Sequence, residues 1–297
     1  MNADSVKCEQ WDVGAIRVTA VVESETGGIP PQMFFPDATA ERVRAQPWAA
    51  GTYSDATGHI AMRVQAFVID DGKRRVLVDP CVGNGKDRAL PFWHQQEYPF
   101  LDRMIAAGYP PNSIDLVVHT HLHADHVGWD TSLRDGHWVP TFANARHLYV
   151  REELEFWQAP EQRTAEDVFA DSIEPIFRAG LAETIADTED LGGGLCLVPS
   201  HGHTPGHASL WIASEDSEAV ITGDFIHHSV QCSEPEWAEV GDLDIELATT
   251  TRRQVLARYA TDERLVLGSH FPTCPAGQIR PSGDVWRFAP VPGAVRA

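Results

Sequence analysis

The sequence has few cysteines, and none of them is paired in a short motif. Its five cysteines are scattered along 297 residues, and no Cys-x-x-Cys pair is present. This spacing indicates neither a thiolate zinc knuckle nor a disulfide framework, so we expect reduced thiols. The sequence also lacks any apolar run close to the roughly 20 residues that a membrane-spanning helix needs. We therefore expect no membrane segment.

Positive charge is scarce as well. The chain has 23 lysine and arginine residues against 43 aspartate and glutamate residues, which gives a formal net charge of −20. Such a surface repels a phosphate backbone, and no dense basic stretch is present to bind an anionic membrane. The first residues lack the basic start and apolar stretch of a signal peptide. We expect a cytoplasmic protein without a nucleic-acid or membrane partner.

Histidine, by contrast, is concentrated. Ten of the fourteen histidines lie in four places along the chain, namely 119–126, 201–207, 227–228 and 270. These places follow stretches that are predicted to be strands. Chance scatter would not concentrate histidines at strand ends, so the pattern indicates a site built from several loops.

The densest segment has the sequence His-Leu-His-Ala-Asp-His and follows the apolar residues 114–118. Residues two apart in an extended chain point to the same side, so His121 and His123 can bind one ion together. Asp125 and His126 follow where the chain turns into a helix, and we expect them to face a second ion. Imidazole nitrogens with a minority of carboxylate oxygens are the ligands that zinc favours.

The rest of the chain alternates predicted strands with predicted helices. Helices are expected at 100–107, 152–157 and 245–259. Strands are expected at 16–22, 62–68, 75–78, 114–118, 147–150, 195–199, 209–213 and 219–222, with a further apolar segment at 265–267. This order predicts an α/β sandwich with its sheets inside. Polar candidates repeatedly follow strands, which is where open α/β folds build their sites.

At this point the chain resembles the metallo-β-lactamase-fold hydrolases. Their pattern is His-x-His-x-Asp-His, a later His in a Gly-His-Thr-x-Gly-His context, an Asp that closes a strand, and a final His. The matching residues here are His121, His123, Asp125, His126, His203, Asp224 and His270. The resemblance implies a four-layer αββα sandwich in a single domain over 1–297. Residues 1–58 would be an N-terminal extension, and residues 59–280 the catalytic core.

Carried over residue by residue, the resemblance implies two divalent metal ions, with Zn²⁺ expected. One ion would take His121, His123 and His203. The other would take Asp125, His126 and His270, and Asp224 would bridge both. His201 is a rival for His203, but the Thr-Pro-Gly-His sequel after residue 203 favours His203.

Two further residues are expected to support the ligands. His207 fits a place behind them, either orienting a ligand or packing under the His203 loop. Asp79 ends a predicted strand and is expected to accept a hydrogen bond from a ligand imidazole. The alternative interpretation is that Asp79 is simply a turn residue before Pro80.

The bridging Asp224 discriminates between branches of the superfamily. True metallo-β-lactamases do not supply an aspartate there, and flavodiiron relatives carry a glutamate where this chain has His123. Lactonases, glyoxalase II and phosphotriesterases keep the aspartate. The segment from Asp224 to Trp237 is most similar to the methyl parathion hydrolase branch. Acyl-homoserine-lactone lactonases carry a tyrosine where this chain has His227.

The expected function is hydrolysis of a small lactone or ester. Two cations about 3.5–4 Å apart can share a hydroxide, present it as a nucleophile near neutral pH, and polarise a carbonyl or phosphoryl oxygen. Asp125 is either the proton donor to the leaving group or a pure ligand, and His227 is expected to contact the substrate oxygen. Phosphotriester hydrolysis is the alternative, and a mononuclear iron sulfur dioxygenase is a more distant one.

The substrate is expected to be a small neutral or apolar molecule. Nine tryptophans could help to line an apolar pocket. The rim candidates are Phe34, Trp93, Trp129, Trp157 and Phe225. The extension at 1–58 is a candidate dimer arm or a candidate lid, with the dimer arm favoured, so a homodimer is a candidate assembly.

Overall fold

The computed structural model describes residues 8–162, 168–262 and 264–296. The chain forms two compact units. The first comprises residues 1–24, 64–187 and 294–297 as far as they are described, and the second comprises 25–63 and 188–293. Within the described ranges, no helix combines the length and the apolar character that are needed to cross a membrane.

The first unit is built on an eight-stranded sheet with the order β17-β1-β2-β3-β4-β5-β8-β9. Its strands are β1 Cys8–Val13, β2 Ile16–Ile29, β3 Ile60–Asp70, β4 Arg75–Val78, β5 Leu116–Val118, β8 Arg146–Val150, β9 Ala182–Ile185 and β17 Ala294–Arg296. Strands β4, β5, β8 and β9 run parallel to one another, whereas β3 and β4 pair antiparallel. The carboxyl ends of β4 and β5 therefore meet at one edge, where Asp79 and the segment 119–126 follow.

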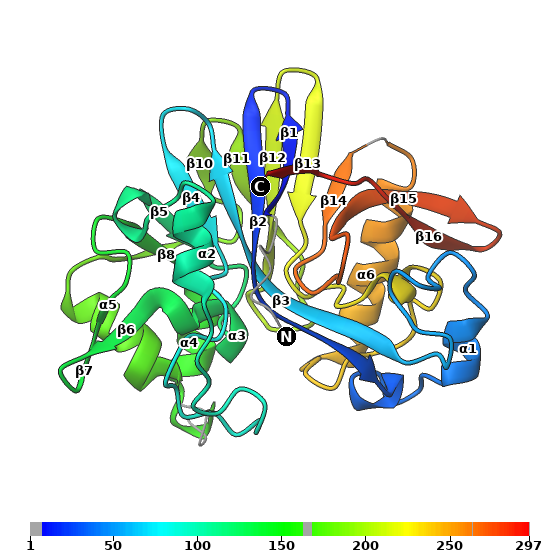
Figure 1. Ribbon diagram of the computed structural model, residues 1–297, viewed down its shortest axis with the longest axis horizontal. Coiled ribbons are helices and arrows are strands. Elements are labelled where there is room, and N and C mark those ends of the chain that lie inside the picture. The colour runs from blue at the N-terminus through cyan, green and yellow to red at the C-terminus, as the bar shows by residue number, and fades with distance from the viewer. Residues whose placement is uncertain (1–7, 163–167, 263, 297) are drawn as a thin grey trace. The chain divides into compact units, whose positions relative to one another are not determined.

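Helix α2, at Phe100–Ala106, covers β4 and β5 of this sheet (Figure 1). Its Phe100 and Met104 pack in one buried apolar cluster with Leu77 and Val117 of those strands. The helix ends where Gly108 adopts a φ of +92°, a conformation that glycine takes without steric cost. The unit also contains α3 Ala124–Val127, α4 Arg151–Gln158, α5 Glu174–Arg178 and the strand pair β6 Thr131–Arg134 and β7 His137–Pro140.

The second unit is built on a seven-stranded sheet with the order β10-β11-β12-β13-β14-β15-β16. Its strands are β10 Asp190–Gly192, β11 Leu195–Pro199, β12 Ala208–Ser214, β13 Ser217–Ile221, β14 Leu265–Leu267, β15 Ala276–Ser282 and β16 Val285–Pro290. Only β13 and β14 form a parallel pair among the described strands of this sheet. Helix α6, at Ile245–Tyr259, connects these two strands and lies beside β15 (Figure 1).

Residues 25–58 are part of the core of the second unit. They include α1, at Ala40–Arg44. The side chains of Phe35, Val43 and Tyr53 have no exposed surface and belong to the apolar cluster that also contains Trp237 and Phe271. This stretch is therefore packed into a unit, and its use as a dimer arm remains a prediction.

Most of the predicted elements are present with small shifts at their ends. The helix expected at 245–259 is α6 with the same bounds, and the helix expected at 152–157 is α4, one residue longer at each end. The strand expected at 16–22 extends to Ile29 as β2, and the one expected at 114–118 begins at Leu116 as β5. The alternation of strands and helices is thus confirmed.

Candidate metal centre

In the first unit, the predicted ligands converge immediately after β5. His121 and His126 are buried, with ring centroids 4.0 Å apart, and Asp125 is 7% exposed. The Nε2 atom of His121 lies 3.1 Å from Nδ1 of His123. Two imidazole nitrogens at this separation need a proton or a cation between them, because two lone pairs would repel each other. The arrangement therefore fits a cation.

Asp79 supports this cluster from the end of β4. Its carboxylate accepts hydrogen bonds from the backbone N–H (2.8 Å) and the hydroxyl (2.7 Å) of Thr120. The Oδ2 atom lies 3.0 Å from Nδ1 of His126, so the two groups are close, and a hydrogen bond between them stays a prediction. A carboxylate at Nδ1 leaves Nε2 of His126 as the ligand atom, which is the usual arrangement of metal-binding histidines. Asp79 reaches this position with a φ of +53°.

In the second unit, Asp224 and His270 follow the ends of the parallel strands β13 and β14. The Oδ2 atom of Asp224 lies 3.2 Å from Nε2 of His270 and 3.8 Å from Nε2 of His203. The Nδ1 atom of His270 lies 2.8 Å from the carbonyl oxygen of Arg63, which can only accept a hydrogen bond. That nitrogen therefore carries a proton, and Nε2 of His270 faces a carboxylate that can only accept, so a proton or a cation must lie between Nε2 and Asp224.

His203 is oriented in a similar way by an acidic residue that the sequence analysis did not identify. Its Nδ1 atom lies 2.9 Å from Oδ1 of Asp242, which is buried. Burial lowers the pKa of His203 to about 4, although the hydrogen bond to Asp242 acts in the opposite direction. The imidazole is therefore neutral at pH 7, the form that binds a metal. His201 is only half-buried, and its carbonyl oxygen accepts a hydrogen bond from Thr251.

His207 lies behind Asp224. Its Nε2 atom accepts a 2.7 Å hydrogen bond from the backbone N–H of Asp224, and its Nδ1 atom lies 2.8 Å from the hydroxyl of Ser200. His207 thus fixes the backbone that carries the proposed bridging carboxylate, which agrees with the supporting place expected for it.

His227 faces the carboxylate of Asp224, as do the predicted ligands His203 and His270. Its Nε2 atom lies 3.1 Å from Oδ2 of Asp224 and 3.6 Å from Oε2 of Glu239, a buried carboxylate that the sequence analysis missed. Burial lowers the pKa of His227, but the charges of Asp224 and Glu239 outweigh it and raise that pKa to about 9. Its Nδ1 atom has no hydrogen-bond partner among the described residues. A metal-binding imidazole normally donates its other N–H, so His227 fits a donor better than a ligand.

His119 and His147 belong to a separate buried network in the first unit. The ring nitrogens of both lie 3.0–3.1 Å from the carboxylate of Asp130, to which Tyr149 donates a 2.8 Å hydrogen bond. The Nδ1 atom of His119 also lies 3.0 Å from the carbonyl oxygen of Leu148. Both ring nitrogens of His119 therefore have partners within the fold, and Asp130 is one of them.

Two of the rim candidates are core residues. Trp129 is 4% exposed, stacks on Phe100 with centroids 5.6 Å apart, and donates a 2.6 Å hydrogen bond to Glu23. Phe225 is 1% exposed and belongs to the apolar core of the second unit. Trp157 is partly exposed, and its ring packs edge-on against His123 at 5.2 Å. Phe34 and Trp93 are also partly exposed.

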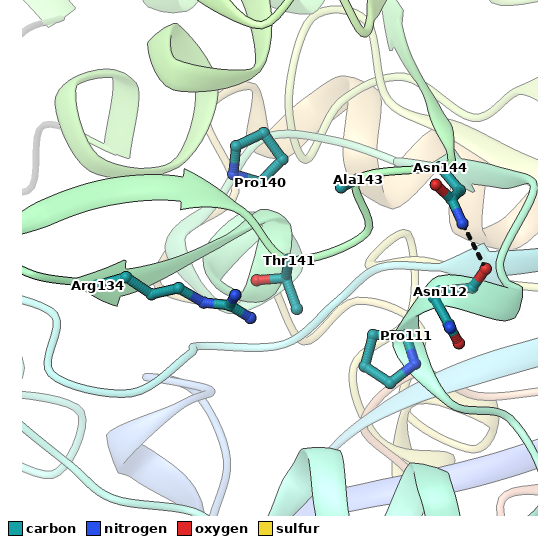
Figure 2. A pocket seen from close by; sticks show the side chains of 7 residues that line it. All are labelled: Pro111, Asn112, Arg134, Pro140, Thr141, Ala143 and Asn144. Carbon is teal, nitrogen blue, oxygen red and sulfur yellow. Dashed lines mark hydrogen bonds between the residues drawn. The ribbon is translucent and has the colours of Figure 1, made fainter.

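A cavity of about 290 Å³ lies elsewhere in the first unit and contains none of the predicted ligands (Figure 2). Arg134 and Thr141 extend into it, and Asn144 donates a hydrogen bond to the carbonyl of Asn112 at its edge. Its few polar groups do not form a set that could hold a metal.

Comparison with known proteins agrees with this geometry. The family model of the metallo-beta-lactamase superfamily matches residues 60–270, a range that includes all seven predicted ligands. The chain belongs to this superfamily. The expected family and the α/β fold class are therefore confirmed.

Several members of this superfamily are similar to the chain. The N-acyl homoserine lactonase AttM of Rhizobium radiobacter is 28% identical over 126 residues, which is 41% of this chain and 44% of AttM. The match thus spans less than half of that relative. The hydrolase AbOPH has a TM-score of 0.81 at 24% identity, over 97% of this chain and 98% of its own. AidC, a dizinc quorum-quenching lactonase, has a TM-score of 0.77 at 18% identity, over 96% of this chain and 97% of its own.

Proposed function

We propose that this superfamily member is a metal-dependent hydrolase that opens a small lactone or cleaves an ester. In this proposal, the predicted ligands bind a pair of divalent ions, with Zn²⁺ the expected metal. His121, His123 and His203 hold one ion, Asp125, His126 and His270 hold the other, and Asp224 bridges them. The observation that carries the proposal is the complete ligand set within residues 60–270.

The protonation of the histidines supports metal binding. In His126, His203 and His270, the Nδ1 atom is directed at an oxygen atom, and Nε2 remains for a cation. Outer partners of this kind fix the tautomer of a ligand and raise its basicity. A donor set of imidazoles and carboxylates suits zinc and related divalent metals.

When bound, two such ions activate water for attack at neutral pH and polarise the oxygen of the bond that is cleaved. The residues of the chain would position the substrate and move protons. In this proposal, His227 would donate a hydrogen bond to the carbonyl oxygen of the substrate, and Asp125 would transfer a proton to the leaving group. The partly exposed Trp157 beside His123 would contact an apolar part of the substrate.

The choice of lactone or ester is supported by the relatives and by charge. AttM and AidC are both lactonases by name. The formal net charge of −20 disfavours anionic substrates over neutral ones, because it repels them during approach. Neutral lactones and aryl esters are therefore the compounds to test first, with phosphotriesters and thioesters as comparisons.

The test combines metal analysis with a substrate screen on one preparation. We expect two zinc-like ions per chain and hydrolysis of at least one lactone or ester. Replacement of the bridge by Asp224→Ala should abolish hydrolysis and reduce bound metal towards one ion per chain. One iron per chain without hydrolysis would contradict the proposal, and so would a fully active, fully loaded Asp224→Ala variant.

A further inference from the structure

An arginine lies on the buried side of α6. Arg252 has no exposed surface, and α6 otherwise buries Ala248, Leu256 and Tyr259 on that side. Isolated charge in such a place is costly unless every donor is satisfied. A hydrophobic side chain of similar size would pack there at no such cost, so the position suggests a purpose other than stability.

The guanidinium of Arg252 binds loops that carry predicted ligands. Its Nε atom donates a 3.0 Å hydrogen bond to the carbonyl of Phe225, the residue after Asp224. Its Nη1 atom donates to the carbonyls of Pro235 and Trp237 at 2.9 and 3.1 Å. Its Nη2 atom donates to Oδ2 of Asp242 at 3.0 Å.

Asp242 connects Arg252 to His203 through hydrogen bonds. Its Oδ1 atom accepts from Nδ1 of His203 at 2.9 Å, while Oδ2 accepts from Arg252 and from the backbone N–H of Glu239 at 3.0 Å. A carboxylate held by Arg252 can only accept, so Nδ1 of His203 must carry the proton. The Nε2 lone pair is then fixed towards Asp224.

The backbone around His203 is also docked on the start of α6. Leu243 donates to the carbonyl of His203 at 3.0 Å, and Asp244 donates to the carbonyl of Gly202 at 2.9 Å. Gly202 has a φ of +127°, and a Cβ atom there would lie only 2.2 Å from the backbone nitrogen of Ala248. Only glycine permits this close approach.

We propose that Arg252 and Asp242 are positioning residues that arrange His203 and the Asp224 loop before a cation binds. The inference rests on the proposed function, because it assigns these two residues to one half of the metal site. Arg252 binds the loop after Asp224 directly and reaches His203 only through Asp242, which fixes the tautomer of His203. Neither residue is expected to touch the metal or the substrate.

The test compares three variants with the wild-type holoenzyme. Asp242→Asn keeps the shape but removes the charge that Arg252 and His203 share, and Arg252→Met keeps most of the volume. Arg253→Met is the matched control, since Arg253 is exposed on the same helix and pairs with Glu236. Zinc affinity is measured by competition with a chromophoric chelator, and ligand geometry by the visible spectrum of the Co²⁺-loaded protein.

We expect zinc affinity at one of the two ions to fall about 10- to 100-fold in Asp242→Asn and Arg252→Met, as is usual for outer partners of metal ligands. The Co²⁺ spectrum should change in both variants, and Arg253→Met should match wild type. If Arg252→Met does not fold, Arg252→Lys and Asp242→Asn carry the test, since Lys keeps the charge but lacks the forked donors.

Two outcomes separate this inference from the proposed function. A wild-type protein that binds no metal overturns the function itself. A wild-type protein that binds two ions, with variants that lose only thermal stability while keeping zinc affinity and the Co²⁺ spectrum, overturns the positioning role alone.

Discussion

At the scale of single residues, the oxygen atom beside Nδ1 of each predicted ligand histidine decides which ring nitrogen can bind a cation. Asp79 and Asp242 lie at the Nδ1 atoms of His126 and His203, and the carbonyl of Arg63 lies at that of His270. These acceptors come from elements distant in sequence. Sequence spacing predicts the ligand histidines and Asp79, but it gives no sign of Asp242 or of the Arg63 carbonyl, which only the fold brings to His203 and His270.

The pair His201 and His203 gives a direct test of the ligand assignment. We expect His203→Ala to reduce kcat/KM by more than the roughly 10- to 100-fold that an outer partner costs, because a ligand is lost. His201→Ala serves as the matched control and should have a much smaller effect. Steady-state kinetics with metal content on both variants checks this, and the reverse ranking would show that His201 is the ligand.

His227 is expected to act in the transition state. A donor to a developing oxyanion can contribute 10²–10³ in kcat, but two metals would already do most of this work, so we expect His227→Phe to lower kcat about tenfold. KM should change less, because the interaction strengthens as charge develops. An unchanged kcat with intact metal content would leave His227 as a rim residue.

At the scale of elements, the loop after β4 depends on a buried acid of β2. Glu23 accepts hydrogen bonds from the backbone N–H groups of Val82 and Gly83 at 3.1 and 3.0 Å. The same loop receives hydrogen bonds from Gly128 and Trp129 at its Cys81 and Pro80 carbonyls, each 2.7 Å long. Glu23 therefore stabilises the segment that begins with Asp79.

The charge state of Glu23 predicts that the free energy of unfolding depends on pH. Burial raises its pKa to about 7, although the hydrogen bonds it accepts oppose this shift. Between its ordinary pKa and 7, the folded state keeps a proton that the unfolded state has lost, so this contribution to stability falls as pH rises. Relative to wild type, Glu23→Gln should gain roughly 3 kcal/mol of unfolding free energy between pH 4.5 and 8.

Urea unfolding at several pH values measures this difference. Glu155→Gln is the control, because Glu155 is an exposed residue of the same unit. A gap between Glu23→Gln and wild type that stays constant with pH would show that Glu23 is ionised throughout.

Some helices and strands could be predicted from the sequence pattern, and others could not. The bounds of α6 were predictable because apolar residues recur on one side and Gly or Pro do not interrupt it. β15 and β16 were not predicted, because Pro281 and the arginines at 280 and 287 hide their alternation. The burial of Arg252 could have been inferred from the sequence, since it occupies the same side of the helix as Ala248 and Leu256. Neither Asp242, which binds Arg252, nor Glu239, which lies beside His227, could be identified from the sequence.

At the scale of the whole molecule, metal removal should destabilise the fold. A ligand that binds only the folded state adds about 2.7 kcal/mol when its free concentration is 100 times Kd. We expect a chelator to lower the melting temperature and added zinc to restore it. Calorimetry on wild type and Asp224→Ala checks this, and the variant should respond less. A melting temperature that does not change after metal is stripped would contradict the prediction.

The parallel pairing of β13 and β14 has a consequence for how the protein is made. Asp224 and His270 become neighbours only after the chain has passed through α6 and returned to the sheet. Such a crossover is a non-local contact whose loop-closure entropy is paid late in folding. We therefore expect a cation to bind this half of its proposed site only once the crossover has closed. Such a cation should slow unfolding more than it changes the folding rate, which stopped-flow kinetics with and without metal would measure.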